Sequence, residues 1–87
     1  MKLKEGFITQ NINDTQFMVS AAEDGFRGLL RNNETAAFIV DCLKEETTEQ
    51  KIIDALWKEY DAPAEQIAED VRNILNVLRD IEALDET

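Results

Sequence analysis

The chain has 87 residues, of which 44% are hydrophobic and 32% charged, so it holds enough apolar material for one small folded domain and too much for a disordered tail. Nine Lys and Arg against 19 Asp and Glu give a formal net charge of -10, and the chain has no His. Because nucleic acids and anionic membranes are bound through basic side chains, this balance argues against both as direct partners.

The cysteine and histidine content and the lack of long apolar stretches exclude several further classes of protein. Cys42 is the only cysteine, which rules out an intramolecular disulfide, and without His it cannot build a structural zinc site. The first residues lack the apolar run of a signal peptide, and no stretch approaches the ~20 apolar residues of a membrane span. We therefore expect a single cytoplasmic domain over residues 1–87, with no metal, no cofactor and no membrane segment.

The first third of the sequence predicts strands. Residues 7–12 and 15–20 are rich in β-branched and aromatic residues, and Asn13-Asp14 between them tolerates the positive φ of a two-residue hairpin turn. In the second strand Gln16 and Met18 alternate with Phe17 and Val19, so one face can be buried. A turn at residues 23–25 then leads into a short third strand over 26–31.

The rest of the sequence predicts three helices. The first covers residues 34–43, with Asn32 and Asn33 as candidate caps and Ala36, Ile39, Val40 and Leu43 on one face. The second covers 48–60, with a capping box from Thr47 to Gln50 and an apolar stripe of Ile52, Ile53, Leu56, Trp57 and Tyr60. The third covers 63–81, with a core seam of Ile67, Val71, Ile74, Leu78 and Ile81, and residues 85–87 are expected to fray.

This order predicts an α+β fold, winged-helix-like, with a three-stranded antiparallel sheet followed by three helices. In a winged-helix protein that binds DNA, the second or third helix would meet the phosphates. Both helices carry more acidic than basic side chains here, so direct DNA binding is disfavoured.

The sequence offers little for catalysis. There is no His to act as a general base, Ser20 is the only serine, and Cys42 lies within an amphipathic helix, where packing is its expected role. Carboxylate neighbours such as Glu69 and Asp70 are typical of a solvated helix face. The three glycines are not spaced as a phosphate-binding loop requires. We expect no enzymatic activity.

Binding without chemistry is the remaining function class. The third strand of a three-stranded sheet is an edge, whose unpaired backbone groups can accept a strand from a partner. The segment Arg27 to Arg31 is either such an edge or a plain structural strand. Val77 lies off the main seam of the third helix, where it either lines a groove beside the strand or simply widens the core stripe.

The order and spacing of several short motifs resemble the coenzyme PQQ synthesis protein D family. The motifs are Asn33-Glu34-Thr35-Ala36-Ala37-Phe38-Ile39, then Thr48-Glu49-Gln50-Lys51-Ile52, Tyr60-Asp61, Asp70-Val71, Ile74-Leu75 and Leu78. The resemblance spans about residues 7–84. The family usually has Leu-Asn before the first helix, where this chain has Asn32-Asn33, which removes an apolar contact at the end of the third strand.

The resemblance implies a non-catalytic, winged-helix-like domain that recognises peptides in the maturation of ribosomally made precursors. Such a domain holds the leader of a precursor peptide as an added strand beside strand three and presents it to a modifying enzyme, often a radical SAM protein. Carried over by position, the implied groove residues are Arg27, Gly28, Leu29, Leu30 and Arg31 on the strand and Asp70, Asn73, Ile74 and Val77 on the third helix.

Two other functions stay open at this point. The acidic helical face could serve a protein-interaction subunit with a basic partner, or the chain could be a winged-helix regulator that reaches DNA through another protein. The identity of the peptide, the final product, the modifying enzyme and the oligomeric state are not encoded in any motif of this sequence.

Overall fold

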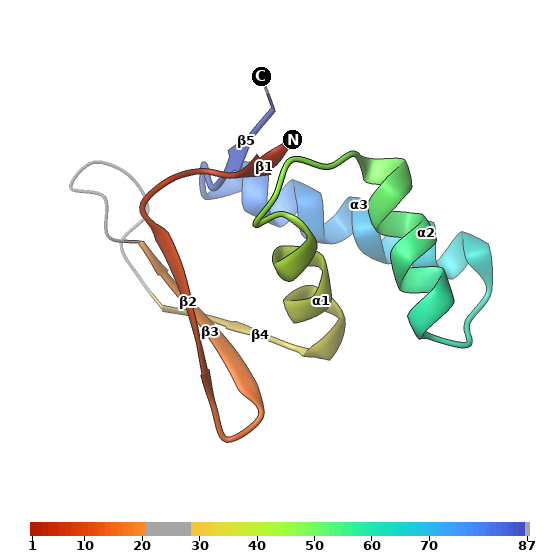
Figure 1. The fold of residues 1–87 in the computed structure, drawn as a ribbon, viewed down its shortest axis with the longest axis horizontal. Helices are drawn as coiled ribbons and strands as arrows, with labels where there is room; N and C mark the ends of the chain where they lie inside the picture. Colours follow the sequence, from red (N-terminus) through yellow and green to blue (C-terminus); the bar gives the residue numbers. More distant parts are fainter. Residues whose placement is uncertain (21–28, 87) are drawn as a thin grey trace.

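The computed structural model describes residues 1–20 and 29–86 and shows an α+β arrangement (Figure 1). Its elements are β1 (Lys2–Leu3), β2 (Phe7–Ile12), β3 (Thr15–Ser20), β4 (Leu29–Asn32), α1 (Glu34–Cys42), α2 (Glu49–Glu59), α3 (Ala64–Asp80) and β5 (Leu84–Asp85). Strands β2, β3 and β4 form an antiparallel sheet in that order, as the sequence predicted. Helix α1 lies between this sheet and the other two helices.

The hairpin of β2 and β3 is confirmed in detail. Asn13 and Asp14 have φ angles of 51° and 64°, the left-handed backbone that a type I′ turn requires at both central positions. The turn pairs Ile12 with Thr15 and thereby sets the register of the whole hairpin. With that register Met18 is fully buried against the helices, because alternate residues of a strand face opposite sides.

The end of the third strand differs from the prediction. β4 continues to Asn32, and the expected strand residues 26–28 lie outside the described part of the chain. Asn32 is buried and donates a hydrogen bond of 2.6 Å from its Nδ2 to Oε1 of Gln16. Asn33 alone caps α1, accepting a 2.8 Å hydrogen bond from the Ala36 amide. The two neighbouring asparagines therefore have different roles.

The first two helices follow their predicted limits within two residues. The predicted face of α1 is confirmed, since Ala36, Ile39, Val40 and Leu43 are all buried. In α2 the expected cap was wrong: Thr48, not Thr47, accepts the hydrogen bond from the Lys51 amide. The expected stripe was also too wide, because Trp57 is 58% exposed.

The buried face of α3 is rotated slightly from the predicted seam. Ile67, Val71 and Leu78 are buried as expected, but Leu75 fills the core position assigned to Ile74. Ile74 and Ile81 are only partly buried and pack at the border of the core. On a helix with 3.6 residues per turn, this rotation leaves Ile74 on the same flank as Asp70, Asn73 and Val77.

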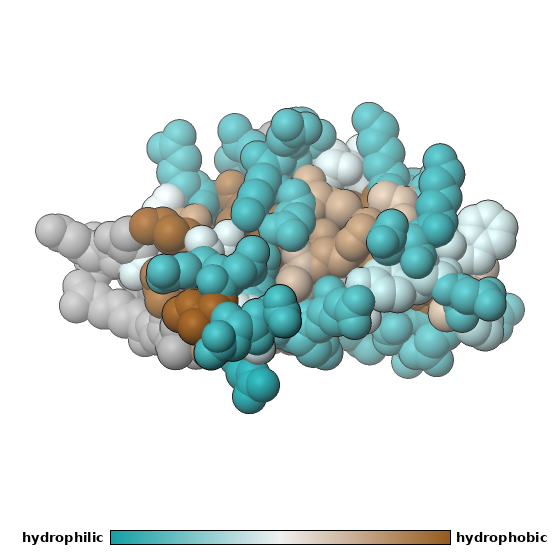
Figure 2. Space-filling view, turned by 60° about the horizontal axis from the view of Figure 1, so that its bottom comes forward, coloured by the Kyte–Doolittle hydropathy of each residue, from teal (hydrophilic) through white to brown (hydrophobic). Residues whose placement is uncertain are grey.

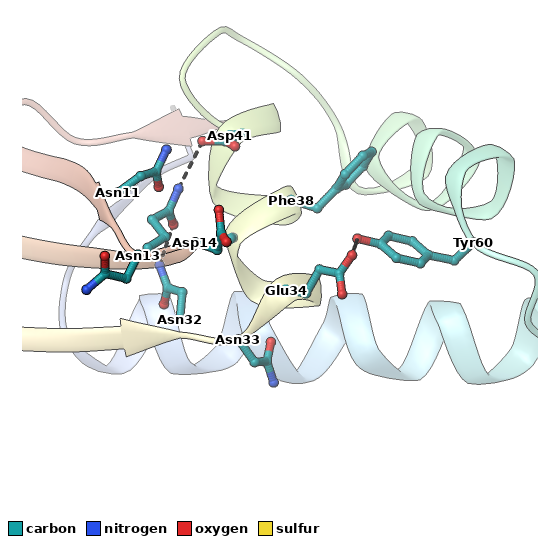
Figure 3. Close-up of a pocket in the computed structure, with 11 residues that line it drawn as sticks. Asn11, Asn13, Asp14, Asn32, Asn33, Glu34, Phe38, Asp41 and Tyr60 are labelled. Carbon is teal, nitrogen blue, oxygen red and sulfur yellow. Dashed lines mark hydrogen bonds between the residues drawn. The ribbon is translucent and has the colours of Figure 1, made fainter.

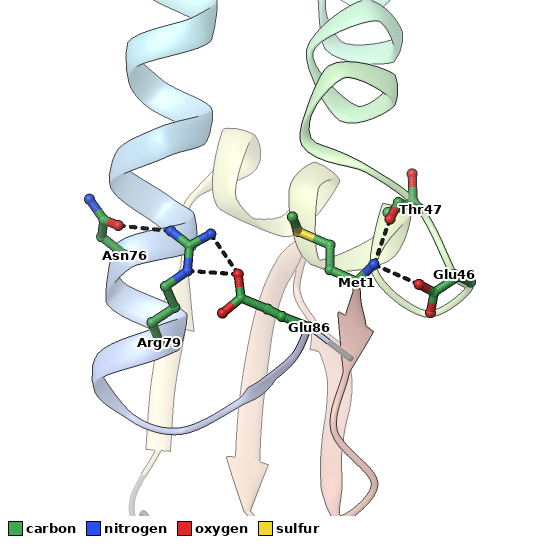
Figure 4. Close-up of polar contacts among 6 residues, drawn as sticks. All are labelled: Met1, Glu46, Thr47, Asn76, Arg79 and Glu86. Atoms are coloured by element: carbon green, nitrogen blue, oxygen red, sulfur yellow. Dashed lines mark hydrogen bonds and ion pairs between the residues drawn. The ribbon is translucent and has the colours of Figure 1, made fainter.

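A small ribbon of β1 and β5 joins the two ends of the chain, which the sequence did not predict (Figure 1). Lys2 pairs with Asp85, and Leu3 also donates a 2.8 Å backbone hydrogen bond to the carbonyl of Leu43. Glu86 accepts two hydrogen bonds from Arg79 (Figure 4), which hold the pKa of the Glu86 carboxyl below its usual value. The expectation of fraying was therefore wrong for Asp85 and Glu86.

Within residues 1–20 and 29–86, none of the helices combines the length and the apolar content that a membrane span requires.

Candidate functional site

The register of the sheet determines which backbone groups of β4 face away from it. In an antiparallel ladder, residues alternate between pairs that exchange backbone hydrogen bonds and pairs that do not. The closing pair of a two-residue hairpin, here Ile12 and Thr15, exchanges backbone hydrogen bonds. Every second residue of β3 after Thr15, that is Phe17 and Val19, therefore also directs its N–H and C=O groups to β2. The residues between them, Gln16 and Met18, direct theirs to β4. Their partners on β4 are Asn32 and Leu30.

The alternate residues of β4, Leu29 and Arg31, consequently direct their N–H and C=O groups away from β3. β4 has β3 as its neighbour on one side, and no other strand of the described ranges pairs with it. This outer border, which we call the β4 edge (Leu29–Asn32), can accept a further strand at two residues. Within the described ranges β4 is therefore an edge strand, as expected for the third strand of this sheet.

The side chains of β4 alternate in the same way. Leu30 lies opposite Met18 and packs, partly buried, against the core. Arg31 lies opposite Phe17 on the other face of the sheet, where its side chain is exposed. Arg27 and Gly28, the other strand residues predicted for the site, lie outside the described residues.

On α3, three of the predicted residues share one hollow. Asp70, Asn73 and Ile74 line a space of about 160 Å³ together with Asn33 and Thr35, which belong to the start of α1. We call this the α1/α3 hollow. It lies where the chain leaves β4, because Asn33 follows the last strand residue directly. Val77, one turn further along α3 from Asn73, is 43% exposed.

Sequence reasoning missed Asn33 and Thr35 as lining residues of this hollow. Asn33 was considered only as a helix cap, and Thr35 carried no signal of its own. Asn33 lies between the end of β4 and the start of α1. Whether such a residue comes close to α3 depends on the angle at which α1 and α3 cross. That crossing is a tertiary feature that local patterns do not contain.

A larger polar hollow lies on the other side of α1 (Figure 3). It encloses about 960 Å³ between the hairpin tip, the end of β4, α1 and Tyr60. Its charged lining residues are Asp14, Glu34 and Asp41. Sequence reasoning gave no sign of it, since its residues come from three separate stretches of the sequence, 11–16, 32–41 and Tyr60.

Several polar groups of this larger hollow are already engaged. Gln16 accepts from Asn32 and donates a 3.0 Å hydrogen bond to Oδ1 of Asp41, which also pairs with Lys44 at 3.1 Å. Tyr60 donates a 3.1 Å hydrogen bond to Glu34, and partial burial together with this bond raises the pKa of the Tyr60 phenol. These contacts tie the sheet and α2 to α1, so their role is structural.

The Cys42 thiol lies in surroundings that disfavour its ionisation. Burial, and secondarily the negative charge of Asp41, raises the pKa of the Cys42 thiol, which disfavours the reactive thiolate. Among residues 1–20 and 29–86, no group of three or more His, Cys, Asp or Glu side chains is placed to hold a metal ion.

The face of the β2–β3 hairpin that is turned away from the core carries an apolar patch. Ile8 and Ile12 of β2 are 55% and 49% exposed, and Val19 of β3 is on the same side. Together with Gln10 and Phe17 they line a shallow hollow of about 190 Å³. Figure 2 shows strongly hydrophobic surface gathered at one end of the molecule, bordered by hydrophilic side chains.

Comparison with known proteins gives matches at the level of family and fold. No curated protein matches the sequence closely enough to be informative. One solved structure, described as TbiB1 in complex with the TbiA(beta) leader peptide, has a TM-score of 0.84 and 21% identity over 100% of this chain and 98% of that one. A second, a lasso peptide synthetase B1 complexed with the leader peptide, has a TM-score of 0.74 and 16% identity over 91% of this chain and 89% of that one.

The sequence itself matches a family model over residues 25–84, more than half of the chain, and this span includes β4, all three helices and every predicted groove residue. The chain therefore belongs to the coenzyme PQQ synthesis protein D (PqqD) family.

Proposed function

We propose that the whole chain acts as one non-catalytic, cytoplasmic peptide-recognition domain on a winged-helix-like scaffold. It holds the leader of a ribosomally made precursor peptide as a fourth strand beside the β4 edge and presents the precursor to a modifying enzyme of the radical SAM type. The observation that carries this proposal is the outward direction of the Leu29 and Arg31 backbone groups. Family membership and two structural neighbours that were solved with leader peptides support it.

The proposed contacts are those that the sequence singled out. The strand side comprises Arg27, Gly28, Leu29, Leu30 and Arg31, and the helix side comprises Asp70, Asn73, Ile74 and Val77. Antiparallel pairing suits the edge best, since each outward residue can then exchange two hydrogen bonds with one peptide residue.

Backbone pairing alone would bind weakly. The two outward residues that the structure describes offer up to four hydrogen bonds, and at about 0.5 to 1.5 kcal/mol each these barely exceed the ~2 to 5 kcal/mol needed to order a flexible leader. Side chains must therefore supply most of the affinity. The partly buried Ile74 and the exposed Val77 provide apolar surface for this on α3.

The alternation of the ladder predicts the pattern of the leader. Peptide residues opposite Leu29 and Arg31 would place their side chains on the outer face, and the residue between them would face the core side and α3. We expect that middle residue to be apolar. We expect an acidic residue opposite the exposed guanidinium of Arg31, because a charge-assisted pair can form there.

The test is a titration of the isotope-labelled chain with the leader peptide encoded beside its gene, followed by NMR. We expect a dissociation constant in the micromolar range and amide shifts at residues 29–31 and 70–77. Shifts confined to α2, or no binding at millimolar peptide, would refute the proposal.

A further inference from the structure

The α1/α3 hollow does not end at α3 but continues towards the end of α2. A second hollow of about 260 Å³ is lined by Thr35, Asp70, Tyr60, Asp61, Leu56, Ala62 and Ile67. It shares Thr35 and Asp70 with the first. The two hollows are therefore neighbours on the surface, and we call them together the α1/α3 groove, whose near end lies where β4 ends.

The chemistry of this groove is specific. Its deeper part has an apolar floor, because Leu56 and Ile67 belong to the core. Asp61 and Asp70 are the charged residues of the groove, and no Lys or Arg is among the described residues that line either hollow. Gln66 donates a 3.0 Å hydrogen bond to Oδ1 of Asp70, which leaves the second carboxylate oxygen for a ligand.

A peptide paired with β4 must enter this groove or leave the surface. β4 ends at Asn32, and the helical backbone from Glu34 onward offers no further strand to pair with. In antiparallel pairing the peptide runs opposite to β4, so the residues on the amino-terminal side of its paired segment would lie nearest Asn33, which lines the first hollow.

We propose that the α1/α3 groove is a second subsite for the leader, which takes the residues immediately before the paired strand. Moving away from the strand, it accepts first a basic side chain at Asp70 and then an apolar side chain over Leu56 and Ile67, next to Asp61. This inference rests on the proposed function, since it places the same peptide further along the molecule.

The test uses the shortest leader fragment that binds in the NMR titration. It is synthesised in three forms: unextended, with Leu-Gly-Lys added at its amino end, and with Leu-Gly-Lys added at its carboxyl end. Because exposed ion pairs and one small apolar contact are weak, we expect the amino-terminal extension to tighten binding about threefold to tenfold. The carboxyl-terminal extension carries the same charge and should change affinity less than twofold.

Variants of the protein test whether the α1/α3 groove causes the tighter binding of the extended peptide. The double variant Asp61→Asn/Asp70→Asn keeps the shape of both side chains and an acceptor for Gln66, so it should fold normally. In this double variant the amino-terminal extension should no longer tighten binding. In Asp80→Asn, which removes one exposed carboxylate at the end of α3, the extension should tighten binding as in the unmodified protein. Added salt should reduce the gain in the unmodified protein.

The outcomes separate this inference from the proposed function. Equal affinity for the two extended peptides, or a gain that survives in Asp61→Asn/Asp70→Asn, would overturn the subsite while the binding of the unextended fragment still supports leader recognition. If no leader fragment binds, the proposed function fails first and the subsite fails with it.

Discussion

The contact between Asn32 and Gln16 shows what a single buried polar pair does in this small protein. Both side chains are buried, and their 2.6 Å hydrogen bond joins the end of β4 to β3. Gln16 passes the link on to Asp41 of α1. The end of the β4 edge is thus fixed to the first helix by side chains as well as by the backbone.

We expect Asn32→Ala to lower the free energy of unfolding by about 1 to 3 kcal/mol, because the buried Gln16 oxygen loses its donor. Urea unfolding followed by circular dichroism measures the change. The matched substitution Asn73→Ala, at an exposed helical position, should be neutral or slightly stabilising. Equal losses in the two variants would contradict a specific role for the buried pair.

Cys42 leads to a prediction about pH. Burial raises the pKa of its thiol, so the folded state favours the neutral form. The folded protein should therefore lose stability as the pH rises through the thiol pKa of the unfolded chain, since only the unfolded chain then ionises freely. Urea unfolding between pH 7 and pH 10 should show this loss, and it should be smaller in Cys42→Ala. An identical pH dependence in both proteins would rule the effect out.

For single residues, the sequence showed where polar side chains would be needed but not which role each of them has. It identified an asparagine pair before the first helix but could not say that Asn33 caps the helix while Asn32 is buried. The two amides have the same chemistry. Their roles are decided by the residue at which the strand ends, and that depends on pairing with β3.

Among the elements, β4 is the one on which the proposed function depends. The hydrogen-bond pattern between β4 and β3 predicts that proline has different effects at the neighbouring residues Leu29 and Leu30. Leu29→Pro removes an N–H that faces away from the sheet on an edge strand, where proline is tolerated. We expect it to keep the fold and to weaken leader binding at least tenfold.

Leu30→Pro is the matched control, because it removes an N–H that pairs with Met18. We expect it to unfold the sheet or to lower the melting temperature strongly. Circular dichroism and the leader titration distinguish the two variants. A folded Leu30→Pro protein beside an unfolded Leu29→Pro protein would show that the assigned ladder is out of phase.

The start of α2 gives a second test at the level of elements. Thr48→Ala removes the hydroxyl that accepts from the Lys51 amide and should cost about 1 kcal/mol of stability. Thr47→Ala, one residue earlier, should cost clearly less, because its hydroxyl is not the cap. Thermal unfolding of both variants would show which threonine begins the helix.

Long elements with a clear local sequence pattern were predicted better than short ones. The hairpin and the three helices carry periodic apolar residues and turn signals over many positions, so their limits were close. β1 and β5 have two residues each and pair across almost the whole chain, so neither had a local signal. The shift from Ile74 to Leu75 in the core of α3 reflects the angle at which α3 packs, which periodicity alone does not determine.

For the whole molecule, the net charge of -10 is the dominant electrostatic feature. Like charges at this density repel one another in the compact state, and salt screens that repulsion. We expect the melting temperature to rise between 20 mM and 500 mM NaCl. A melting temperature that falls with salt would indicate that ion pairs such as that of Arg79 with Glu86 outweigh the repulsion.

The proposed pairing at the β4 edge also has a kinetic consequence. A micromolar complex that forms at about 10⁶ per molar per second would last about one second. A complex of this lifetime lasts long enough for a slow enzyme to capture the precursor, and it dissociates soon enough that a finished product does not block the next cycle. The lifetime of the paired strand would then set the turnover of the adaptor.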